Sequence, residues 1–475
     1  MTVDKPSYGD NDPIAATATP LGESALALIR TSGGGPGRDV QSAVELLARV
    51  FSRPEKLLSA PPNSVVHGWI IESASGSPEK IDEVLVSVYR GPRSYTGEDG
   101  ADISCHGGIA AVKAVLAALK KAGFREALPG EFTFRSFMNG KLDLTRAESV
   151  MELVAAKTNR GREQAVRRLA GALEQVISAI KNLLVEILAA AEIYLDYSED
   201  EFIAPLPDRK PAEEAADRLR RLSELWRRER IYAEGALAVL AGRPNAGKSS
   251  LFNYLLREDR SIVTNVPGTT RDWIEALISV NDIPLRLADT AGLRKLDAAK
   301  VDEAQREPEN LGIQRSLELL EKADLVLYVI DGEKGFTGED GEFLSSFQKT
   351  GPEKPILILW NKADLSPLPA SSQWNAVTAK TGEGILALMQ AIGGRLESAS
   401  ASQEATGPGT ARQKELIDSA LASVDEALAL TDRGEPLDIV ASLYRSAINA
   451  LGEITGEVSN ADILEVMFSR FCVGK

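Results

Sequence analysis

One glycine-rich segment has the residue types and the spacing of a phosphate-binding loop. Gly242 and Gly247 frame it, and Lys248 and Ser249 follow directly. Glycines let backbone N–H groups turn towards phosphate oxygens, the lysine neutralises the β- and γ-phosphates, and the serine hydroxyl can bind Mg²⁺. An apolar strand is expected before the loop at 237–240 and a helix after it, which is the context that this motif needs. The segment therefore predicts a nucleoside triphosphate site.

Two later motifs complete such a site and select the base. The run Asp289-Thr-Ala-Gly292 follows an expected strand at 285–287, which places a carboxylate near the magnesium ion and a glycine amide near the γ-phosphate. The run Asn361-Lys-Ala-Asp364 follows an expected strand at 356–360. Its last carboxylate can accept both N–H groups on one edge of guanine, whereas adenine presents the reverse pattern there. These motifs predict that the site prefers GTP to ATP.

The segment between the phosphate loop and these motifs carries candidate groups for hydrolysis. Thr270, within Thr264–Asp272, is the threonine that we expect to complete the magnesium shell. Leu293 stands where Ras-like enzymes have a water-orienting glutamine, so another group must position the water. The side-chain oxygen of Asn245 could hold a monovalent cation that stabilises developing negative charge, as an arginine finger does. Support of its own loop is the alternative interpretation of Asn245.

A third loop is placed to support the base from below. It spans 378–380 after an expected short strand at 376–377, and an ordinary surface loop is the alternative. The residues expected to bind GTP are Asn245, Ala246, Gly247, Lys248, Ser249, Ser250, Thr264, Asn265, Val266, Pro267, Gly268, Thr269, Thr270, Asp289, Thr290, Ala291, Gly292, Asn361, Lys362, Asp364, Thr378, Ala379 and Lys380. Lys248 is also an expected catalytic residue, as is Arg271.

The bulk composition limits what surrounds this site. A chain of 475 residues exceeds one hydrophobic core, so we expect two to four domains. With 44% hydrophobic and 26% charged residues the composition is globular, and no apolar run reaches the roughly 18 residues that span a bilayer. Two cysteines form no disulfide framework, and the polar start is unlike a secretory signal, so we expect a cytoplasmic protein. The net charge of −15 argues against coating nucleic acid by bulk electrostatics.

The order of expected elements divides the chain into parts. Residues 1–140 mix strand patterns, such as 25–29 and 84–89, with a helical stretch at 110–122. Helical periodicity dominates 141–234, and after a loop at 198–211 a helix is expected from Ala212. Strands and helices alternate over 235–396, which predicts a doubly wound sheet, and 397–475 is a linker followed by helices. The economical arrangement is a helical domain with the nucleotide domain inserted in it.

The motifs as a set resemble the MnmE (TrmE) family of tRNA-modification GTPases. The resemblance covers nearly the whole chain. It rests on Gly242–Ser250, Gly268–Asp272, Asp289–Leu293 and the terminal Phe471-Cys-Val-Gly-Lys475, together with Ala18–Pro20, Leu28–Gly33, Ser94–Asp99, His106–Gly108, Pro129–Phe132 and Asn139–Leu144 in the first domain. The resemblance implies an N-terminal α/β folate-binding domain, an all-α domain and an inserted Ras-like P-loop domain.

The resemblance also implies roles for residues around the nucleotide. Ser249 and Thr270 would hold Mg²⁺, and the potassium site would be lined by Asn245, Thr264, Val266 and Thr269. The water-orienting acid of the family stands shortly before a Gly-Ile pair, the place of Glu309 here. The segment 295–307 is longer than usual, and its Glu303 and Glu307 are rivals for this role. A solvated loop charge is the alternative for each of these acids.

Further implied residues belong to a folate site. Arg30, Lys141 and Lys475 carry over directly, and Asp102 stands where the family typically has Glu, which keeps the charge and shortens the reach. A carboxylate suits the donor edge of a pterin, and basic side chains suit the glutamyl tail. On spacing alone Arg30 and Lys141 are ordinary surface charges. Cys472 matches the family's C-terminal cysteine and is an expected catalytic residue, with an ordinary buried thiol as the alternative.

The function implied by the resemblance is GTP hydrolysis coupled to tRNA modification. The protein would be a homodimer joined through its N-terminal domains and would work with an FAD-containing MnmG partner. Together they would add an aminomethyl or carboxymethylaminomethyl group to C5 of the wobble uridine, using a carbon from 5,10-methylene-tetrahydrofolate. A ribosome-assembly GTPase shares the phosphate loop but usually brings a basic RNA-binding domain or tandem G domains. A folate-regulated interaction switch is the other alternative.

Overall fold

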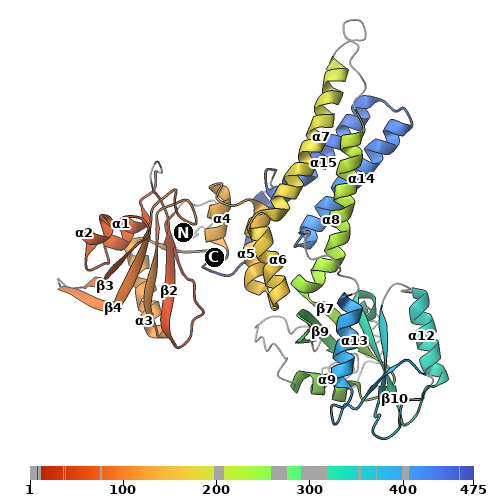
Figure 1. Ribbon diagram of the computed structural model, residues 1–475. Helices are drawn as coiled ribbons and strands as arrows, with labels where there is room; N and C mark the ends of the chain where they lie inside the picture. Colours follow the sequence, from red (N-terminus) through yellow and green to blue (C-terminus); the bar gives the residue numbers. More distant parts are fainter. Residues whose placement is uncertain are drawn as a thin grey trace, which may run out of the picture. The chain divides into compact units, whose positions relative to one another are not determined.

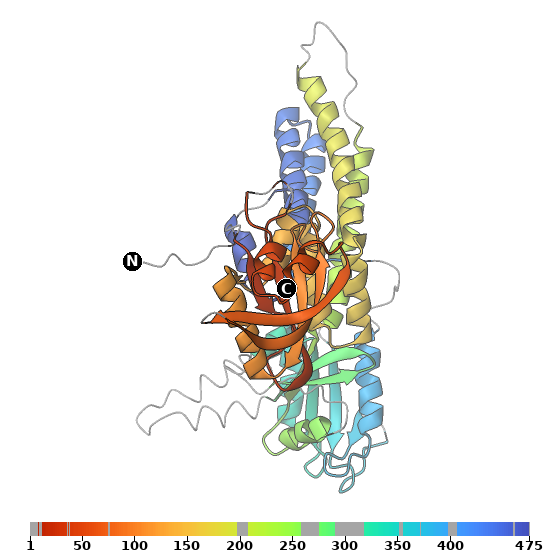
Figure 2. The same cartoon turned by 90° about the vertical axis from the view of Figure 1, so that its left-hand side faces the viewer.

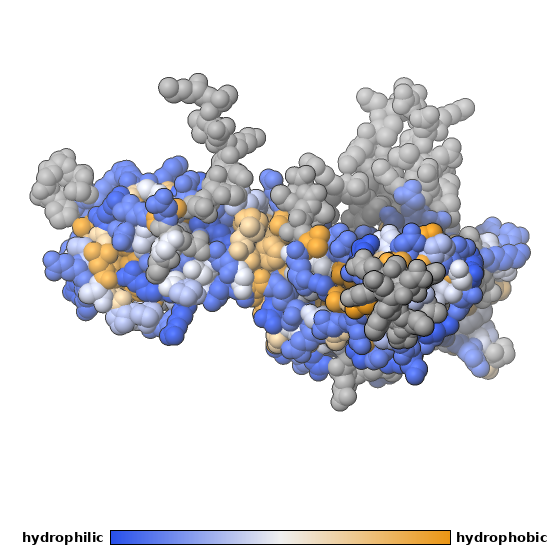
Figure 3. All heavy atoms as spheres, turned by 90° about the horizontal axis from the view of Figure 1, so that it is seen from above, coloured by the Kyte–Doolittle hydropathy of each residue, from blue (hydrophilic) through white to orange (hydrophobic). Residues whose placement is uncertain are grey.

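The computed structural model divides the chain into two compact units. Unit 1 comprises Met1–Met151 with Ile448–Lys475, and unit 2 comprises Glu152–Ala447. The residues that the structure describes are 8, 12–35, 37, 39–74, 77–196, 208–257, 275–289, 318–350, 355–370, 372–397, 406–458 and 461–474. Among them, no helix is long and apolar enough to cross a membrane. Hydrophilic side chains cover most of the face drawn in Figure 3, and apolar ones gather in a few patches.

Unit 1 is built on a six-stranded sheet in the order β3-β4-β5-β2-β1-β6. Its strands are β1 (Ile14–Thr17), β2 (Ser24–Ser32), β3 (Ser64–Ala74), β4 (Ser77–Tyr89), β5 (Gly100–Gly107) and β6 (Arg125–Glu126). All neighbours pair antiparallel except β1 and β6. The helices are α1 (Ala43–Ala48), α2 (Pro54–Leu58), α3 (Ile109–Ala122), α4 (Glu131–Met138) and α16 (Ala461–Phe468). The expected strands and helix of this mixed α/β region are confirmed.

Alternation along the strands separates the two faces of this sheet. Ile29 and Ile103 are fully buried and belong to one core cluster with Val44 of α1 and Leu119 of α3. The residues that flank Ile29 in β2 and Ile103 in β5 point to the opposite face, because successive side chains of a strand alternate. That face holds Arg30 and other residues of intermediate or full exposure. The two faces therefore divide core packing from the side chains that are available for binding.

Long helices make up the helical part of the chain. They are α5 (Leu144–Ala155), α6 (Asn159–Leu169), α7 (Ala172–Asp196), α8 (Lys210–Glu234), α14 (Ala411–Asp432) and α15 (Leu437–Thr455). Within unit 2, α7 and α14 both run beside α8 (Figure 1, Figure 2). The helix expected from Ala212 begins two residues earlier, because Pro211 is tolerated in a first turn. The doubly wound domain is thus inserted between α8 and α14, as expected.

The inserted domain is a six-stranded sheet in the order β12-β11-β10-β7-β9-β8. Its elements are β7 (Ala236–Ala241), α9 (Lys248–Arg257), β8 (Glu275–Val280), β9 (Ile283–Asp289), β10 (Leu325–Asp331), α12 (Gly338–Thr350), β11 (Ile356–Asn361), β12 (Asn375–Val377) and α13 (Ile385–Glu397). All pairs are parallel except β8 with β9, which form a hairpin at one edge.

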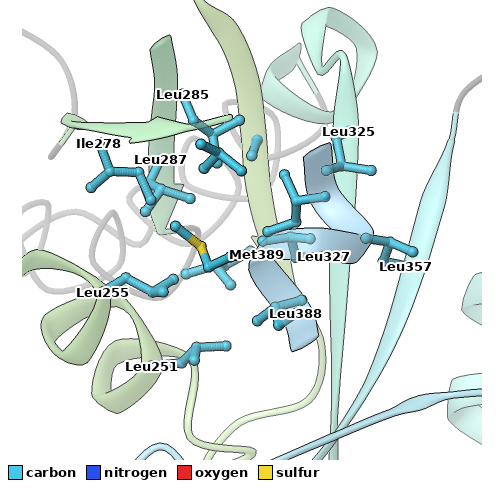
Figure 4. Packing of buried hydrophobic residues seen from close by; sticks show 14 of the residues in the cluster. Leu251, Leu255, Ile278, Leu285, Leu287, Leu325, Leu327, Leu357, Leu388 and Met389 are labelled. Atoms are coloured by element: carbon cyan, nitrogen blue, oxygen red, sulfur yellow. The ribbon is translucent and has the colours of Figure 1, made fainter. Parts of the chain in front are cut away.

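Apolar side chains cover both faces of this sheet. On one face, Leu251 and Leu255 of α9 and Leu388 and Met389 of α13 pack against the leucines of the strands (Figure 4). On the other face, the rings of α12 pack against a second buried cluster that includes Tyr328. Strands buried on both sides read as continuous apolar runs, which is why the sequence revealed them. The expected doubly wound fold is confirmed.

A buried arginine joins the helices to both ends of the inserted domain. Arg168 of α6 is 1% exposed. It pairs with Glu152 of α5 at 2.7 Å and with Glu229 of α8 at 3.1 Å, and it donates to the carbonyl of Gly407 at 3.3 Å. Burial raises the pKa of Glu229, and the charge of Arg168 opposes this. Glu229 precedes β7 and Gly407 follows α13, so both connections of the domain meet at one guanidinium.

Removal of this guanidinium is expected to destabilise the protein strongly. Arg168→Ala leaves the buried carboxylate of Glu229 and the largely buried carboxylate of Glu152 without their cation, which costs about 3–5 kcal/mol of unfolding free energy. Arg220→Ala is the matched control, because Arg220 of α8 is 47% exposed and pairs with Asp425 at the surface. That loss is expected to stay below about 1 kcal/mol. Urea unfolding followed by helical circular dichroism measures both, and equal losses would contradict the role assigned to Arg168.

Candidate functional site

The phosphate loop joins the carboxyl end of β7 to α9. Gly242, Asn245 and Gly247 have positive φ angles of 134°, 63° and 93°. A Cβ on Gly242 would lie 2.3 Å from the carbonyl oxygen of Val329, and one on Gly247 would lie 2.1 Å from Nδ2 of Asn361. Only glycine fits these two positions, because both the backbone angle and the space exclude a side chain. The loop thus has the sharp turns that an anion-binding loop requires.

Lys248 and Ser249 open α9 and face the carboxyl edge of the sheet. The ammonium group of Lys248 donates to the carbonyls of Gly242 and Arg243 at 2.7 and 2.8 Å, which holds it over the loop. The hydroxyl of Ser249 donates to Oδ2 of Asp289 at 2.8 Å. The structure therefore brings together two groups that were expected around magnesium. Among the described residues, no group of three or more His, Cys, Asp or Glu side chains could hold a metal ion.

Asn361 ties the phosphate loop to the base-reading loops. Its side chain is buried, and its Nδ2 donates to the carbonyl of Ala246 at 2.8 Å. Its Oδ1 accepts the backbone N–H of Ala379 at 3.1 Å. The three loops come from β7, β11 and β12, whose carboxyl ends lie at one edge of the parallel sheet. One amide group thus fixes the distance between the phosphate end and the base end of the site.

Lys362 and Asp364 follow Asn361 with different surroundings. Lys362 donates to Asp331 at 2.9 Å and to Glu333 at 2.8 Å, and these hydrogen bonds raise its pKa. Asp364 is exposed, and its carboxylate makes no hydrogen bond to any described residue. The carboxylate can therefore accept the N–H groups of a base. Asp331 and Glu333 were missed by the sequence analysis; their position at the end of β10, beside β11, was the available signal.

The third loop is held closely against its neighbours. The N–H of Thr378 donates to the carbonyl of Glu383 at 2.9 Å, while its Oγ1 is buried and has no partner among the described residues. Ala379 is buried and Lys380 is exposed. A buried hydroxyl without a partner is what a bound ligand or water satisfies. The loop 378–380 therefore has a backbone held by its neighbours and one buried hydroxyl that a ligand or water can satisfy.

Several residues of the expected site lie outside the described residues. They are Thr264, Asn265, Val266, Pro267, Gly268, Thr269, Thr270, Arg271, Thr290, Ala291, Gly292, Leu293, Glu303, Glu307, Glu309 and Lys475. Of the expected nucleotide-contacting residues, those from β7, α9, β9, β11 and β12 converge on one edge of the sheet. Ser249, Ser250 and Asn245 are exposed there, and Ala246 is buried.

A second polar cluster lies on the open face of the sheet in unit 1. Nε of Arg30 pairs with Oδ1 of Asp102 at 3.1 Å, directly across β2 and β5. Arg30 also donates to the carbonyl of Gly474 at 3.4 Å, so the C-terminal segment reaches this pair. Lys141 donates to the carbonyl of Pro92 at 2.9 Å and packs against Gly97. Arg30, Asp102 and the residue before Lys475 are therefore neighbours, and Lys141 joins them through the 92–97 loop.

Aromatic side chains complete this cluster and were missed by the sequence analysis. The hydroxyl of Tyr89 donates to Oδ2 of Asp102 at 3.4 Å; burial, and then the charge of Asp102, raise its pKa, which keeps the donor protonated. The guanidinium of Arg30 lies 5.7 Å from the ring centre of Tyr95 and 5.9 Å from that of Phe132. Tyr95 and Phe132 belong to the Ser94–Asp99 and Pro129–Phe132 motifs, which was the signal that could have found them.

Buried ion pairs hold the two motif loops in place. Glu98 and Glu131 are 2% and 0% exposed, and both pair with Arg135, at 3.1 and 2.7 Å. The hydroxyl of Ser136 donates to the carbonyl of Tyr95 at 2.8 Å. The acidic residues of both motifs are therefore internal supports. Because they fix the loop backbone, the exposed ring of Tyr95 stays beside Arg30.

The two cysteines have different surroundings. Cys105 is buried in the sheet, and burial raises the pKa of its thiol to about 11. Cys472 is exposed, and its carbonyl accepts the N–H of Gly130 at 3.2 Å. The alternative of a buried thiol for Cys472 is therefore wrong. The C-terminal motif presents this side chain at the surface because its backbone is tied to the loop before α4.

Known proteins match the chain along its length. The family model for the MnmE helical domain matches residues 144–472, and the model for the GTP-binding protein TrmE N-terminus matches 13–141. The tRNA modification GTPase MnmE of Treponema denticola is 39% identical over 509 aligned positions, covering 100% of both chains. That of Carboxydothermus hydrogenoformans is 40% identical over 484 positions, covering 98% of this chain and 99% of the relative. The chain belongs to the MnmE family.

As a member of the MnmE family, the protein is a GTPase with a P-loop domain inserted in a helical domain. Membership in a family of GTPases identifies GTP as the substrate of the protein. The loops around Gly247, Asn361 and Ala379 are the ones that the sequence analysis expects around GTP, and the two hydrogen bonds of Asn361 join them. The exposed carboxylate of Asp364 has the acceptor oxygens that the expected preference for guanine requires.

The bridge formed by Asn361 gives a direct test of the nucleotide site. Asn361→Ala removes two buried hydrogen bonds, each contributing about 1–1.5 kcal/mol, and is expected to weaken GDP binding roughly 10²-fold. Asn253→Ala is the matched control, since Asn253 is an exposed residue of the adjacent α9. Titration with a fluorescent GDP analogue measures both affinities. GDP binding of Asn361→Ala at the level of the control would contradict the bridging role.

Proposed function

We propose that this GTPase drives modification of C5 of the wobble uridine in tRNA, together with an MnmG-type FAD protein. The group added is aminomethyl or carboxymethylaminomethyl, and its carbon comes from 5,10-methylene-tetrahydrofolate or a related folate. The observation that carries this proposal is the cluster of Arg30 and Asp102 on the open sheet face of a chain that also carries a GTP site. The names of the relatives, tRNA modification GTPases, support the substrate class. We place this reaction in the cytoplasm.

The chemistry of the cluster suits a folate. The carboxylate of Asp102 can accept the adjacent N–H groups of a pterin ring, while Tyr89 and Arg30 fix its orientation. The ring of Tyr95 offers an apolar surface, and Lys141 and Lys475 supply positive charge for the glutamyl tail. Cys472, which is exposed in the same C-terminal segment, is the proposed catalytic thiol. The expected boundaries 1–140, 141–234, 235–396 and 397–475 remain our proposal for the domains.

Nucleoside analysis of bulk tRNA tests this function. A strain that lacks the gene is expected to lose the modified wobble uridine, and the wild-type gene is expected to restore it. Asp102→Ala is expected to fail to restore it while GTP hydrolysis by the purified variant persists, because Asp102 lies outside the GTPase domain. Glu79→Ala, an exposed acid on β4 of the same unit, is the control. Unchanged wobble uridine in the deletion strain would refute the proposal.

We also propose that hydrolysis depends on potassium and magnesium. Ser249 and Thr270 hold Mg²⁺, and Asn245, Thr264, Val266 and Thr269 line the potassium site. The exposed amide of Asn245, at a positive φ, makes no hydrogen bond to described residues, which favours a ligand over support of its own loop. Glu309 orients the water, Arg271 adds positive charge, and Lys248 balances the phosphates. The cation takes the place of an arginine finger.

Turnover in different salts tests the cation. Replacement of potassium by sodium is expected to lower GTP turnover roughly 10²-fold, the effect of losing one group that stabilises transition-state charge. Asn245→Ala is expected to turn over GTP in potassium at the slow rate seen in sodium. Asn253→Ala, in the neighbouring helix, is expected to keep the full salt dependence. Equal wild-type turnover in the two salts would eliminate the potassium site.

A homodimer joined through unit 1 is the proposed assembly. The open face of its sheet carries exposed apolar side chains at Leu26 (64%), Val65 (61%) and Leu85 (48%). They lie on three different strands, and Arg30 and Asp102 share their face. Exposed apolar residues on one sheet face favour burial against a second copy. Light scattering of the full chain and of Leu85→Asp measures this, and a wild-type monomer would contradict it.

A further inference from the structure

The β8–β9 turn of the GTPase domain caps a helix of the helical part. The carboxylate of Asp282 accepts the N–H of Asn159 at 3.0 Å through Oδ1 and the N–H of Arg160 at 2.7 Å through Oδ2. These are the first residues of α6, where N–H groups lack partners within the helix. A negative charge at this end is also stabilised by the helix dipole. A residue more than a hundred positions away therefore completes the start of α6.

The same helix also has a local cap. The side chain of Thr158 accepts the N–H of Gly161 at 3.2 Å. Asp282 and Thr158 thus share the donors of one helix start, one from another domain and one from the adjacent residue. The local cap satisfies one of the four N–H groups that lack partners at the start of α6, and Asp282 satisfies two more from the β8–β9 turn. The contact with Asp282 is therefore best explained as a link between domains.

The turn itself is packed on two sides. Asn281 and Asp282 have φ angles of 50° and 63°, and Val280 pairs directly with Ile283. Gly393 of α13 lies so close that a Cβ on it would be 2.3 Å from Nδ2 of Asn281. The turn is therefore fixed between α13 and the start of α6. Such a turn transmits a shift of its strands instead of absorbing it.

The first turn of α6 is also held against the end of α8. The guanidinium of Arg160 lies 4.0 Å from the ring centre of Tyr232. A Cβ on Gly161 would lie 2.7 Å from the carbonyl oxygen of Tyr232. The far end of α6 carries Arg168, which binds both connections of the GTPase domain. A shift received at Asn159 therefore acts on a helix that is anchored at both ends.

The β8–β9 hairpin, whose turn contains Asp282, connects the two segments that the sequence analysis expects beside the magnesium ion and the γ-phosphate. In sequence, β8 begins three residues after Asp272, and β9 ends at Asp289, which accepts from Ser249. We propose that Asp282 is a positioning residue that couples the nucleotide state to α6 and through it to the helical domain. A change at the nucleotide shifts the β8–β9 hairpin, and the two hydrogen bonds of Asp282 transmit this shift to the start of α6.

Hydrogen exchange of the full chain tests this coupling. Peptides that span 156–166 are followed in the GDP complex and in the complex with guanylyl imidodiphosphate and Mg²⁺. In the wild type their exchange is expected to differ between the two complexes. In Asp282→Ala it is expected to rise about fivefold, the effect of a lost helix cap, and to become the same in both. Wild-type exchange that does not depend on the nucleotide would overturn the proposal.

Two further variants separate coupling from simple fraying of the helix. Thr158→Ala removes the local cap and leaves Asp282 in place, so exchange is expected to rise by a similar factor while its nucleotide dependence persists. Asp282→Asn keeps an acceptor oxygen and is expected to keep a reduced difference; it carries the test if Asp282→Ala does not bind GDP. Loss of the difference in Thr158→Ala, or its full retention in Asp282→Ala, would show that Asp282 does not couple the two regions.

Discussion

The ion pairs of Arg168 are the interaction on which the arrangement of unit 2 depends. A buried guanidinium is stable only where carboxylates surround it, and here they come from α5 and α8. The carbonyl of Gly407 adds the segment that returns from the GTPase domain. An inserted domain has two covalent connections, and both are fixed at one point. The other contacts between the GTPase domain and the helices are then not needed to hold the domain in place, and they can change with the bound nucleotide.

Within the GTPase domain, the side chain of Asn361 joins separate segments, as Arg168 does for unit 2. Its amide group donates to the phosphate loop and accepts from the base-supporting loop. A primary amide is suited to this because it is both a donor and an acceptor. The close approach of Gly247 to the same amide explains why a glycine must precede Lys248. The loops expected to bind the phosphates and to support the base are therefore connected through one side chain.

Much of this architecture could be predicted from the sequence because the signals are local. The buried strands of the GTPase domain are continuous apolar runs, and the glycines of the phosphate loop mark backbone angles that other residues avoid. The partners of Arg168 and Asp282 could not be predicted, since they lie far apart along the chain and no periodicity marks them. Tyr89 was missed for the same reason: its partner Asp102 is on the neighbouring strand.

The different character of the two contacts explains how one helix can both anchor a domain and respond to it. The contact of Arg168 is buried and involves full charges, so its rupture is costly. The contact of Asp282 lies at the exposed start of α6 and involves backbone donors, where a cap contributes about 1 kcal/mol. A nucleotide-dependent shift can therefore alter the weaker contact while the stronger one holds. A shift of the β8–β9 turn therefore acts first on the start of α6, while Arg168 holds the far end of the helix.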